Sequence, residues 1–207
     1  MQPNCKHKSR SRNLEQAVQA YMAAGGSDTR DRWPVLWTAI QVNLGNALQA
    51  LGERKGSIVL LVEAVAAYRS IVQYVNGDDQ IQWAAHYNIG NAHIALSKLQ
   101  SGSASLESAI TAYQTALASH GIRSDTIKFI AVHHNLGNAF RMLGERMRSR
   151  EALHQALHFY HAGLRAIRTV DAPVQRELFN RNIQRTHDSV RELQEQSKVS
   201  NLMQESG

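Results

Sequence analysis

The phrase NLGNAL at residues 43–48 returns as NIGNAH at 88–93 and as NLGNAF at 135–140. The steps between these copies are 45 and 47 residues. A second phrase, apolar-x-x-Ala-apolar-x-x-Tyr, occurs at 14–21, 61–68, 106–113 and 153–160, and its tyrosines step by 47, 45 and 47 residues. Because the two phrases keep the same spacing along the chain, the sequence is built from an internal repeat.

Each phrase has the periodicity of a helix. Leu61, Ala64, Val65 and Tyr68 fall at i, i+3, i+4 and i+7, so they share one helical face. Glycine-containing turns separate the phrases, and no stretch alternates apolar and polar residues as a strand does. The predicted fold class is therefore all-α, an α-solenoid of stacked antiparallel helix pairs with about eight helices.

The turn signals predict one helical-repeat domain over residues 13–196. We expect a half unit at 13–33, units at 34–78, 79–123 and 124–170, and a polar capping helix at 173–196. A basic, flexible extension is expected at 1–12 and a frayed tail at 197–207.

Small residues at matching positions predict how the helices of a pair pack. A glycine inside a helix costs about 1 kcal/mol relative to alanine, so close contact with a neighbouring helix should offset that cost. We expect the alanine of the second helix to lie opposite the glycine, and the tyrosine to fill the wider space one turn further on. The predicted repeat contacts are Gly45, Ala64 and Tyr68, then Gly90, Ala109 and Tyr113, and finally Gly137, Ala156 and Tyr160.

These residues resemble the tetratricopeptide repeat, which carries Leu-Gly in its first helix and Ala-x-x-x-Phe/Tyr in its second. The resemblance extends over about residues 13–195. The unit of 45–47 residues is longer than the usual unit of about 34, and Leu48, His93 and Phe140 replace the first-helix tyrosine. Long units of this kind resemble bacterial tandem arrays of the family.

The resemblance implies a non-catalytic protein-protein interaction scaffold that binds a peptide in a concave groove lined by first-helix side chains. The positions that map to this groove are Asn43, Asn46, Gln49, Tyr87, Asn88, Asn91, His134, Asn135, Asn138, Arg141, Arg181, Asn182 and Arg185. Amide side chains offer donors and acceptors to the backbone of an extended ligand. The alternative is that these asparagines only bond neighbouring helices.

The partner implied by the resemblance is a protein or peptide, and the arginines of the late groove favour an acidic one. The cation clamp by which some family members bind acidic chaperone tails is not supported, because Val42, Ala131 and Asn135 occupy matching positions.

The formal net charge of +6 is concentrated toward both ends, and the middle of the chain is neutral. A regulatory or nucleic-acid-associated function using these basic ends is the alternative to the peptide scaffold. Direct nucleic-acid binding is not favoured, because the basic residues are not interleaved with exposed aromatics or a groove-reading motif.

No apolar run suited to a secretory signal or a membrane span follows Met1, so we expect a cytoplasmic protein without a membrane partner. The predicted helix at 13–24 lacks a first helix of its own, so it could pack on the next pair, associate with another copy of the chain, or continue a longer array.

The sequence predicts neither an enzyme nor a cofactor or metal site. His154 and His158 have the spacing of the H-E-x-x-H zinc helix, with His161 as a third candidate, but Gln155 replaces the catalytic glutamate. The glycine-rich stretch at 52–57 lacks the order of a phosphate-binding loop. Cys5 lies in the expected flexible extension, where no base is fixed beside it.

Overall fold

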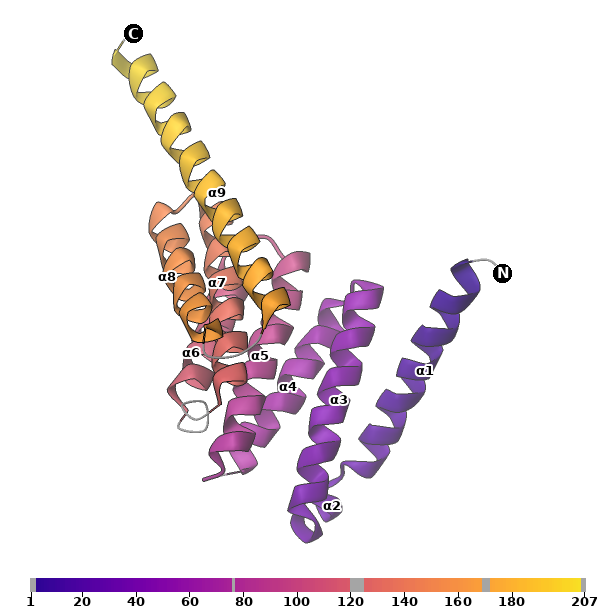
Figure 1. Ribbon diagram of the computed structural model, residues 1–207. Helices are drawn as coiled ribbons and strands as arrows, with labels where there is room; N and C mark the ends of the chain where they lie inside the picture. Colours follow the sequence, from indigo (N-terminus) through magenta and orange to yellow (C-terminus); the bar gives the residue numbers. More distant parts are fainter. Residues whose placement is uncertain (1–2, 76, 120–124, 169–171, 206–207) are drawn as a thin grey trace. The chain divides into compact units, whose positions relative to one another are not determined.

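The structure is a computed structural model that describes residues 3–75, 77–119, 125–168 and 172–205. These residues form nine α-helices and no strand (Figure 1). The helices are α1 (Pro3–Ala24), α2 (Ser27–Arg32), α3 (Pro34–Lys55), α4 (Ile58–Tyr74), α5 (Asp79–Leu99), α6 (Ala104–Ala118), α7 (Thr126–Met147), α8 (Arg150–Ile167) and α9 (Pro173–Glu205).

Local side-chain chemistry fixes where several helices start. Ser57 and Ser149 accept a hydrogen bond from the backbone N–H of the third residue beyond them, at the start of α4 and α8. Asp78 and Asp125 each accept two such bonds at the start of α5 and α7. These caps satisfy N–H groups that have no partner inside the helix, and each cap contributes typically about 1 kcal/mol.

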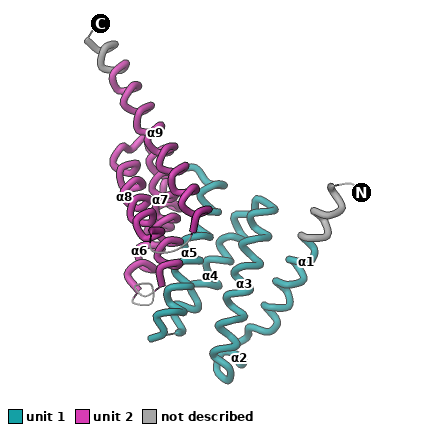
Figure 2. The backbone as a smooth tube through the Cα atoms, viewed as in Figure 1, with its two compact units in different colours: residues 1–101 teal, residues 102–207 magenta. Residues whose placement is uncertain are grey.

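The chain divides into two compact units between Ser101 and Gly102 (Figure 2). In unit 1, residues 1–101, α3 packs against α1, α2 and α4, and α4 packs against α5. In unit 2, residues 102–207, α7 packs against α6 and α8, and α8 packs against α9. Side-by-side helix pairs within each unit confirm the predicted all-α solenoid class.

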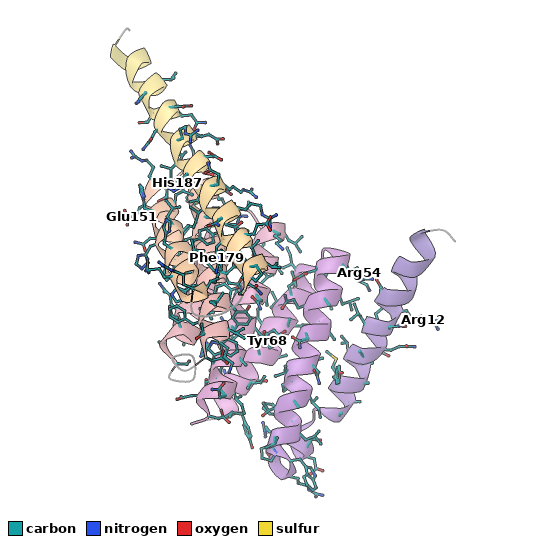
Figure 3. All side chains as sticks on the ribbon, viewed as in Figure 1. Arg12, Arg54, Tyr68, Glu151, Phe179 and His187 are labelled. Atoms are coloured by element: carbon teal, nitrogen blue, oxygen red, sulfur yellow. The ribbon has the colours of Figure 1, made fainter. Side chains whose placement is uncertain are left out.

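The core of each unit is built from the repeated phrases. Leu61, Tyr68 and Ile71 of α4 are fully buried in unit 1. In unit 2, Tyr160 and Ile167 of α8 pack with Phe179 of α9, whose position is labelled in Figure 3. Gly163 leaves room for that ring, since an added Cβ would come within 2.5 Å of Phe179 Cε1.

The helix pairs close on the glycines in a way that differs from the sequence prediction. A Cβ added to Gly45 would lie 2.5 Å from Tyr68 Cε1, and one added to Gly137 would lie 2.5 Å from Tyr160 Cδ1. At Gly45 and Gly137 the tyrosine ring therefore lies nearest to the space that the glycine leaves, where the sequence placed the alanine. An aromatic ring at this place fills the volume that the missing side chain leaves, which keeps the interior close-packed.

The remaining members of the repeat set are also buried. Ala64, Ala109 and Ala156 have no exposed surface. Gly90 of α5 is buried in unit 1 and Tyr113 of α6 in unit 2.

The structure differs from the expected boundaries at both ends and near residue 101. Helix α1 starts at Pro3 in place of residue 13, and α9 continues to Glu205 in place of residue 196. Both added stretches are mostly polar, and the first carries no apolar period to detect, but their residues are compatible with a helix. The short helix α2 raises the predicted count of eight to nine in the described residues. The boundary between the compact units falls inside the expected repeat unit 79–123.

Candidate binding surface

The same tyrosine-to-asparagine hydrogen bond occurs in both units. The hydroxyl of Tyr68 donates to Asn46 Oδ1 at 2.7 Å, and the hydroxyl of Tyr160 donates to Asn138 Oδ1 at 2.7 Å. In each case the tyrosine ring is fully buried while its hydroxyl reaches the first-helix asparagine. The bond therefore fixes the amide plane of a predicted groove residue from the core side.

His134 connects α7 to α9 in unit 2. The Nδ2 group of Asn182 donates to His134 Nε2 at 3.0 Å and lies 3.3 Å from Asn138 Oδ1. His134 Nδ1 lies 3.3 Å from Asn135 Oδ1, which suits the tautomer with the proton on Nδ1. These contacts join four predicted groove residues into one network: His134, Asn135, Asn138 and Asn182. At Asn138 and Asn182, the asparagines therefore do bond a neighbouring helix, as the alternative interpretation expects.

Burial determines the charge state of this network. Desolvation lowers the pKa of His134, and the nearby charge of Arg141 lowers it further, against the opposing hydrogen bond to Asn135. Burial also raises the pKa of the Tyr160 hydroxyl to about 12. The network is therefore neutral near pH 7, which lets it donate and accept hydrogen bonds without an uncompensated charge.

Arg141 turns toward Glu145, one turn further along α7. Its Nη1 donates to the two carboxylate oxygens at 2.7 and 2.8 Å, and the Arg141 residue is only 9% exposed. Ser189 of α9 donates to Glu145 Oε1 at 3.1 Å, and Arg185 Nε lies 3.7 Å from the same oxygen. Arg141 was predicted as a groove cation, but its charge is neutralised and largely buried, so we correct its role to support of the α7–α9 contact.

Arg181 differs from Arg141, because it is exposed on α9 and forms no ion pair within the described residues. Arg185 is 65% exposed at its side chain despite its contact with Glu145. A shallow pocket of about 160 Å³ lies beside this contact and is lined by residues of α7, α9 and the turn after α7: Glu145, Arg148, Ser189, Glu192, Leu193 and Gln196. Of the predicted late-groove cations, Arg181 and Arg185 are the two that face solvent.

The predicted positions of unit 1 lie on α3 and α5. Asn43 and Asn46 are exposed, and Gln49 is half-buried and donates to Glu53 at 2.9 Å. On α5, Asn88 and Asn91 are half-buried, and Tyr87 stacks on Trp83 with 5.2 Å between ring centroids. Helices α3 and α5 contact each other, so both sets belong to one packed unit.

Glu145 and Ser189 were not predicted from the sequence. The Arg141 to Glu145 spacing of four residues was available as a signal, because such pairs meet on one helical face. Ser189 had no such signal, since its contact depends on how α9 packs against α7.

The histidine stripe of α8 shows no metal-binding geometry in the described part of the chain. No group of three or more His, Cys, Asp or Glu side chains is arranged there to hold a metal ion. His154, His158 and His161 are exposed on α8, and His158 packs edge-on against Phe159. The side chain of Cys5 lies outside the described residues, although its backbone is part of α1.

Within the described residues, none of the helices combines the length and apolar character that crossing a bilayer requires.

Comparison with known proteins agrees with the repeat pattern. Residues 37–76, which contain the NLGNAL phrase at 43–48 of α3 and the tyrosine-containing phrase at 61–68 of α4, match the family model of the tetratricopeptide repeat. No curated protein matches the chain. Among solved structures, the crystal structure of MamA protein is similar at 16% sequence identity with a TM-score of 0.33, covering 84% of this chain and 92% of that one.

Proposed function

We propose that this tetratricopeptide-repeat chain is a non-catalytic interaction scaffold whose first-helix face binds a peptide segment of a protein partner. The observation that carries the proposal is the repeated tyrosine-to-asparagine bond at Asn46 and Asn138. The buried tyrosine hydroxyl holds the surface amide of the asparagine in place before a peptide arrives. Binding a peptide therefore costs less side-chain entropy, because the amide is already ordered.

The fixed amide of Asn46 retains hydrogen-bonding capacity. Tyr68 uses one lone pair of Oδ1, and the Nδ2 group of Asn46 makes no hydrogen bond within the described residues. Asn43, one helical turn earlier and exposed, has no hydrogen-bond partner there either. Two amides at i and i+3 can bond both the N–H and the C=O groups of an extended peptide.

The charge on the α9 surface supports a preference for acidic segments. Arg181 is exposed and unpaired within the described residues, and Arg185 shares Glu145 with the buried Arg141. One carboxylate beside two guanidinium groups leaves a net positive charge, which an acidic peptide side chain would complement.

The test is selection of binding peptides from a random library by the purified chain, followed by fluorescence anisotropy with the best peptide. We expect Asn43→Trp and Asn88→Trp to weaken binding by tenfold or more, because a bulky ring would cover the amide face. For a peptide that binds unit 2, Arg181→Glu should weaken an acidic peptide more than a neutral one. Gln73→Trp, at an exposed position of the second helix α4, is the matched control and should bind as the wild type does.

Failure to select any peptide, or selected peptides whose affinity is the same in all these variants, would refute the proposal. Circular dichroism of each variant would establish that the helices are intact.

A further inference from the structure

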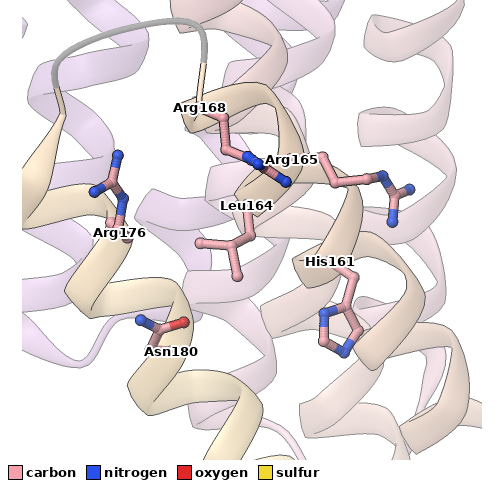
Figure 4. A pocket seen from close by; sticks show the side chains of 6 residues that line it. All are labelled: His161, Leu164, Arg165, Arg168, Arg176 and Asn180. Carbon is pink, nitrogen blue, oxygen red and sulfur yellow. The ribbon is translucent and has the colours of Figure 1, made fainter.

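A second surface of unit 2 is hollowed between α8 and α9. The pocket has a volume of about 520 Å³ and is lined by His161, Leu164, Arg165, Arg168, Arg176 and Asn180 (Figure 4). Leu164 lies in the middle of this group, and the polar side chains surround it (Figure 4). Pockets of this size hold small molecules or single large side chains.

The described residues of the lining carry concentrated positive charge and include no carboxylate. Arg165, Arg168 and Arg176 all belong to the lining, and none of them forms an ion pair with a described acidic residue. The field of Arg165 reaches the neighbouring His133, whose pKa is lowered mainly by burial and further by the charges of His158 and Arg165. Three like charges around one hollow repel each other unless an anion lies between them.

The pocket lies on a different edge of α9 from the amide network. Residues of a helix advance by about 100° each, so Arg176 and Asn180 share one edge. Asn182, Arg185 and Ser189, which contact α7, share another. The buried stripe that includes Phe179 runs between the two edges. The pocket therefore lies apart from the part of α9 that belongs to the proposed peptide-binding face.

The position of Arg176 is unfavourable for the helix that carries it. Helix α9 begins at Pro173, so Arg176 lies in its first turn, and no acidic residue is present there. The positive end of the helix dipole disfavours a cation at this place. Arg165 and Arg168 lie at the end of α8, where a cation is favourable. Helix stability thus explains the two arginines of α8 but not Arg176, whereas a bound anion would explain all three.

We propose that this pocket binds a phosphate group, either as a free phosphate or on a phosphorylated side chain. Guanidinium groups from two helices would bond different oxygens of the tetrahedral dianion, and the Asn180 amide would donate to it. Leu164 supplies an apolar floor for the carbon atoms of a phosphorylated side chain. Among the described lining residues, none carries a negative charge that would compete with the dianion for the arginines.

The experiment is titration of the full chain with inorganic phosphate at constant ionic strength, followed through the arginine Nε–Hε signals in NMR spectra. We expect saturable shifts of the pocket arginines with phosphate and none with chloride. Arg168→Gln and Arg176→Gln should each weaken binding by about tenfold, the effect of losing one charge-assisted hydrogen bond. Arg150→Gln, an exposed arginine of α8 outside the pocket, is the matched control.

A parallel titration with a short phosphoserine peptide and its serine counterpart distinguishes the two sources. If the phosphoserine peptide binds at least tenfold tighter than inorganic phosphate, the site takes a phosphorylated side chain, and equal affinity assigns it to free phosphate. Non-saturable shifts, equal affinity in the glutamine variants, or binding only of a DNA oligonucleotide would overturn the proposal. Because the serine peptide and the amide-face variants are measured separately, failure here leaves the proposed scaffold function untouched.

Discussion

The ring of Tyr160 occupies the space beside Gly137, where an added Cβ would lie 2.5 Å from the ring carbon Cδ1. Real Cβ atoms essentially never approach a neighbour so closely, and the ring is fully buried, so it cannot swing away. We therefore predict that Gly137→Ala lowers the free energy of unfolding, because overpacking of this kind costs about 1–3 kcal/mol. Alanine's higher helix propensity, about 1 kcal/mol, offsets part of that cost, so we expect a net loss of about 1–2 kcal/mol because the buried ring has no room to yield. Urea denaturation followed by circular dichroism measures the change.

Gly26→Ala is the control for that substitution. A Cβ at Gly26 would meet nothing within 4 Å, and its φ of −66° suits any residue. We expect its effect to stay below about 1 kcal/mol, because only a preference at a helix start is altered. An unchanged or raised stability of Gly137→Ala would show that the ring and the glycine do not pack as described.

Tyr160→Phe removes the hydroxyl that donates to Asn138 while the ring stays in place. Asn138 Oδ1 keeps its contact with Asn182, so the loss should be that of one partly buried hydrogen bond, about 1 kcal/mol. Tyr74→Phe is the matched control, since the Tyr74 hydroxyl lies 3.3 Å from the exposed Asp31 carboxylate. Equal unfolding midpoints for wild type and Tyr160→Phe would argue against a fixed amide at Asn138, and so against the main support for the binding face.

Much of the fold could be predicted because the repeat encodes it locally. The helical spacing of Leu61, Ala64 and Tyr68 requires only the geometry of one helix, and all three are buried as predicted. The partner of the glycine could not be predicted in the same way. Ala156 and Tyr160 lie one turn apart on α8. Which of them lies nearest to Gly137 depends on how far α8 is shifted along α7, and the spacing within one helix does not determine that shift.

The candidate site also contains residues that the repeat predicts and contacts that depend on how the helices pack. Asn138 and Asn182 were placed on one surface by the repeat, and the structure joins them. Arg141 turns inward because it binds Glu145, which Ser189 of α9 also contacts. The sequence spacing could predict the Arg141–Glu145 pair, but it could not predict the contact between Ser189 and Glu145. The α8–α9 pocket was not predicted at all, because its arginines come from two helices whose facing edges no single periodic pattern identifies.

Glu145→Gln should destabilise unit 2 by about 1–3 kcal/mol. The carboxylate is bonded by Arg141 and Ser189, and its loss leaves the largely buried Arg141 cation without a counter-charge. Asp28→Asn, which breaks an ion pair between side chains that are 72% and 81% exposed, is the control and should have little effect. Thermal unfolding at low and high salt measures both, and equal small effects would contradict the structural role given to Arg141.

Stability should fall as the pH drops below about 7. Burial lowers the pKa of His86, His93, His133 and His134 below the ordinary value of 6.5 in the folded chain. The unfolded chain therefore binds more protons in this range, so the stabilisation is complete above the unfolded pKa and is lost as the pH falls toward the folded pKa. Each such histidine contributes at most about 1.4 kcal/mol per pH unit.

His134→Gln tests this at one position, because glutamine can still accept from Asn182 but does not titrate. Unfolding free energies measured from pH 7.5 to 5.5 should show a shallower slope in His134→Gln than in the wild type, whatever the absolute stability of the variant. Gln155→Asn changes an exposed side chain of the same unit that does not titrate, and it should retain the wild-type slope. The carboxylate of Asp125, whose pKa is lowered by its bonds at the start of α7, acts only at more acidic pH, so it does not confound this window. A slope that is the same in all three proteins would mean that His134 is not desolvated in the α7–α9 network.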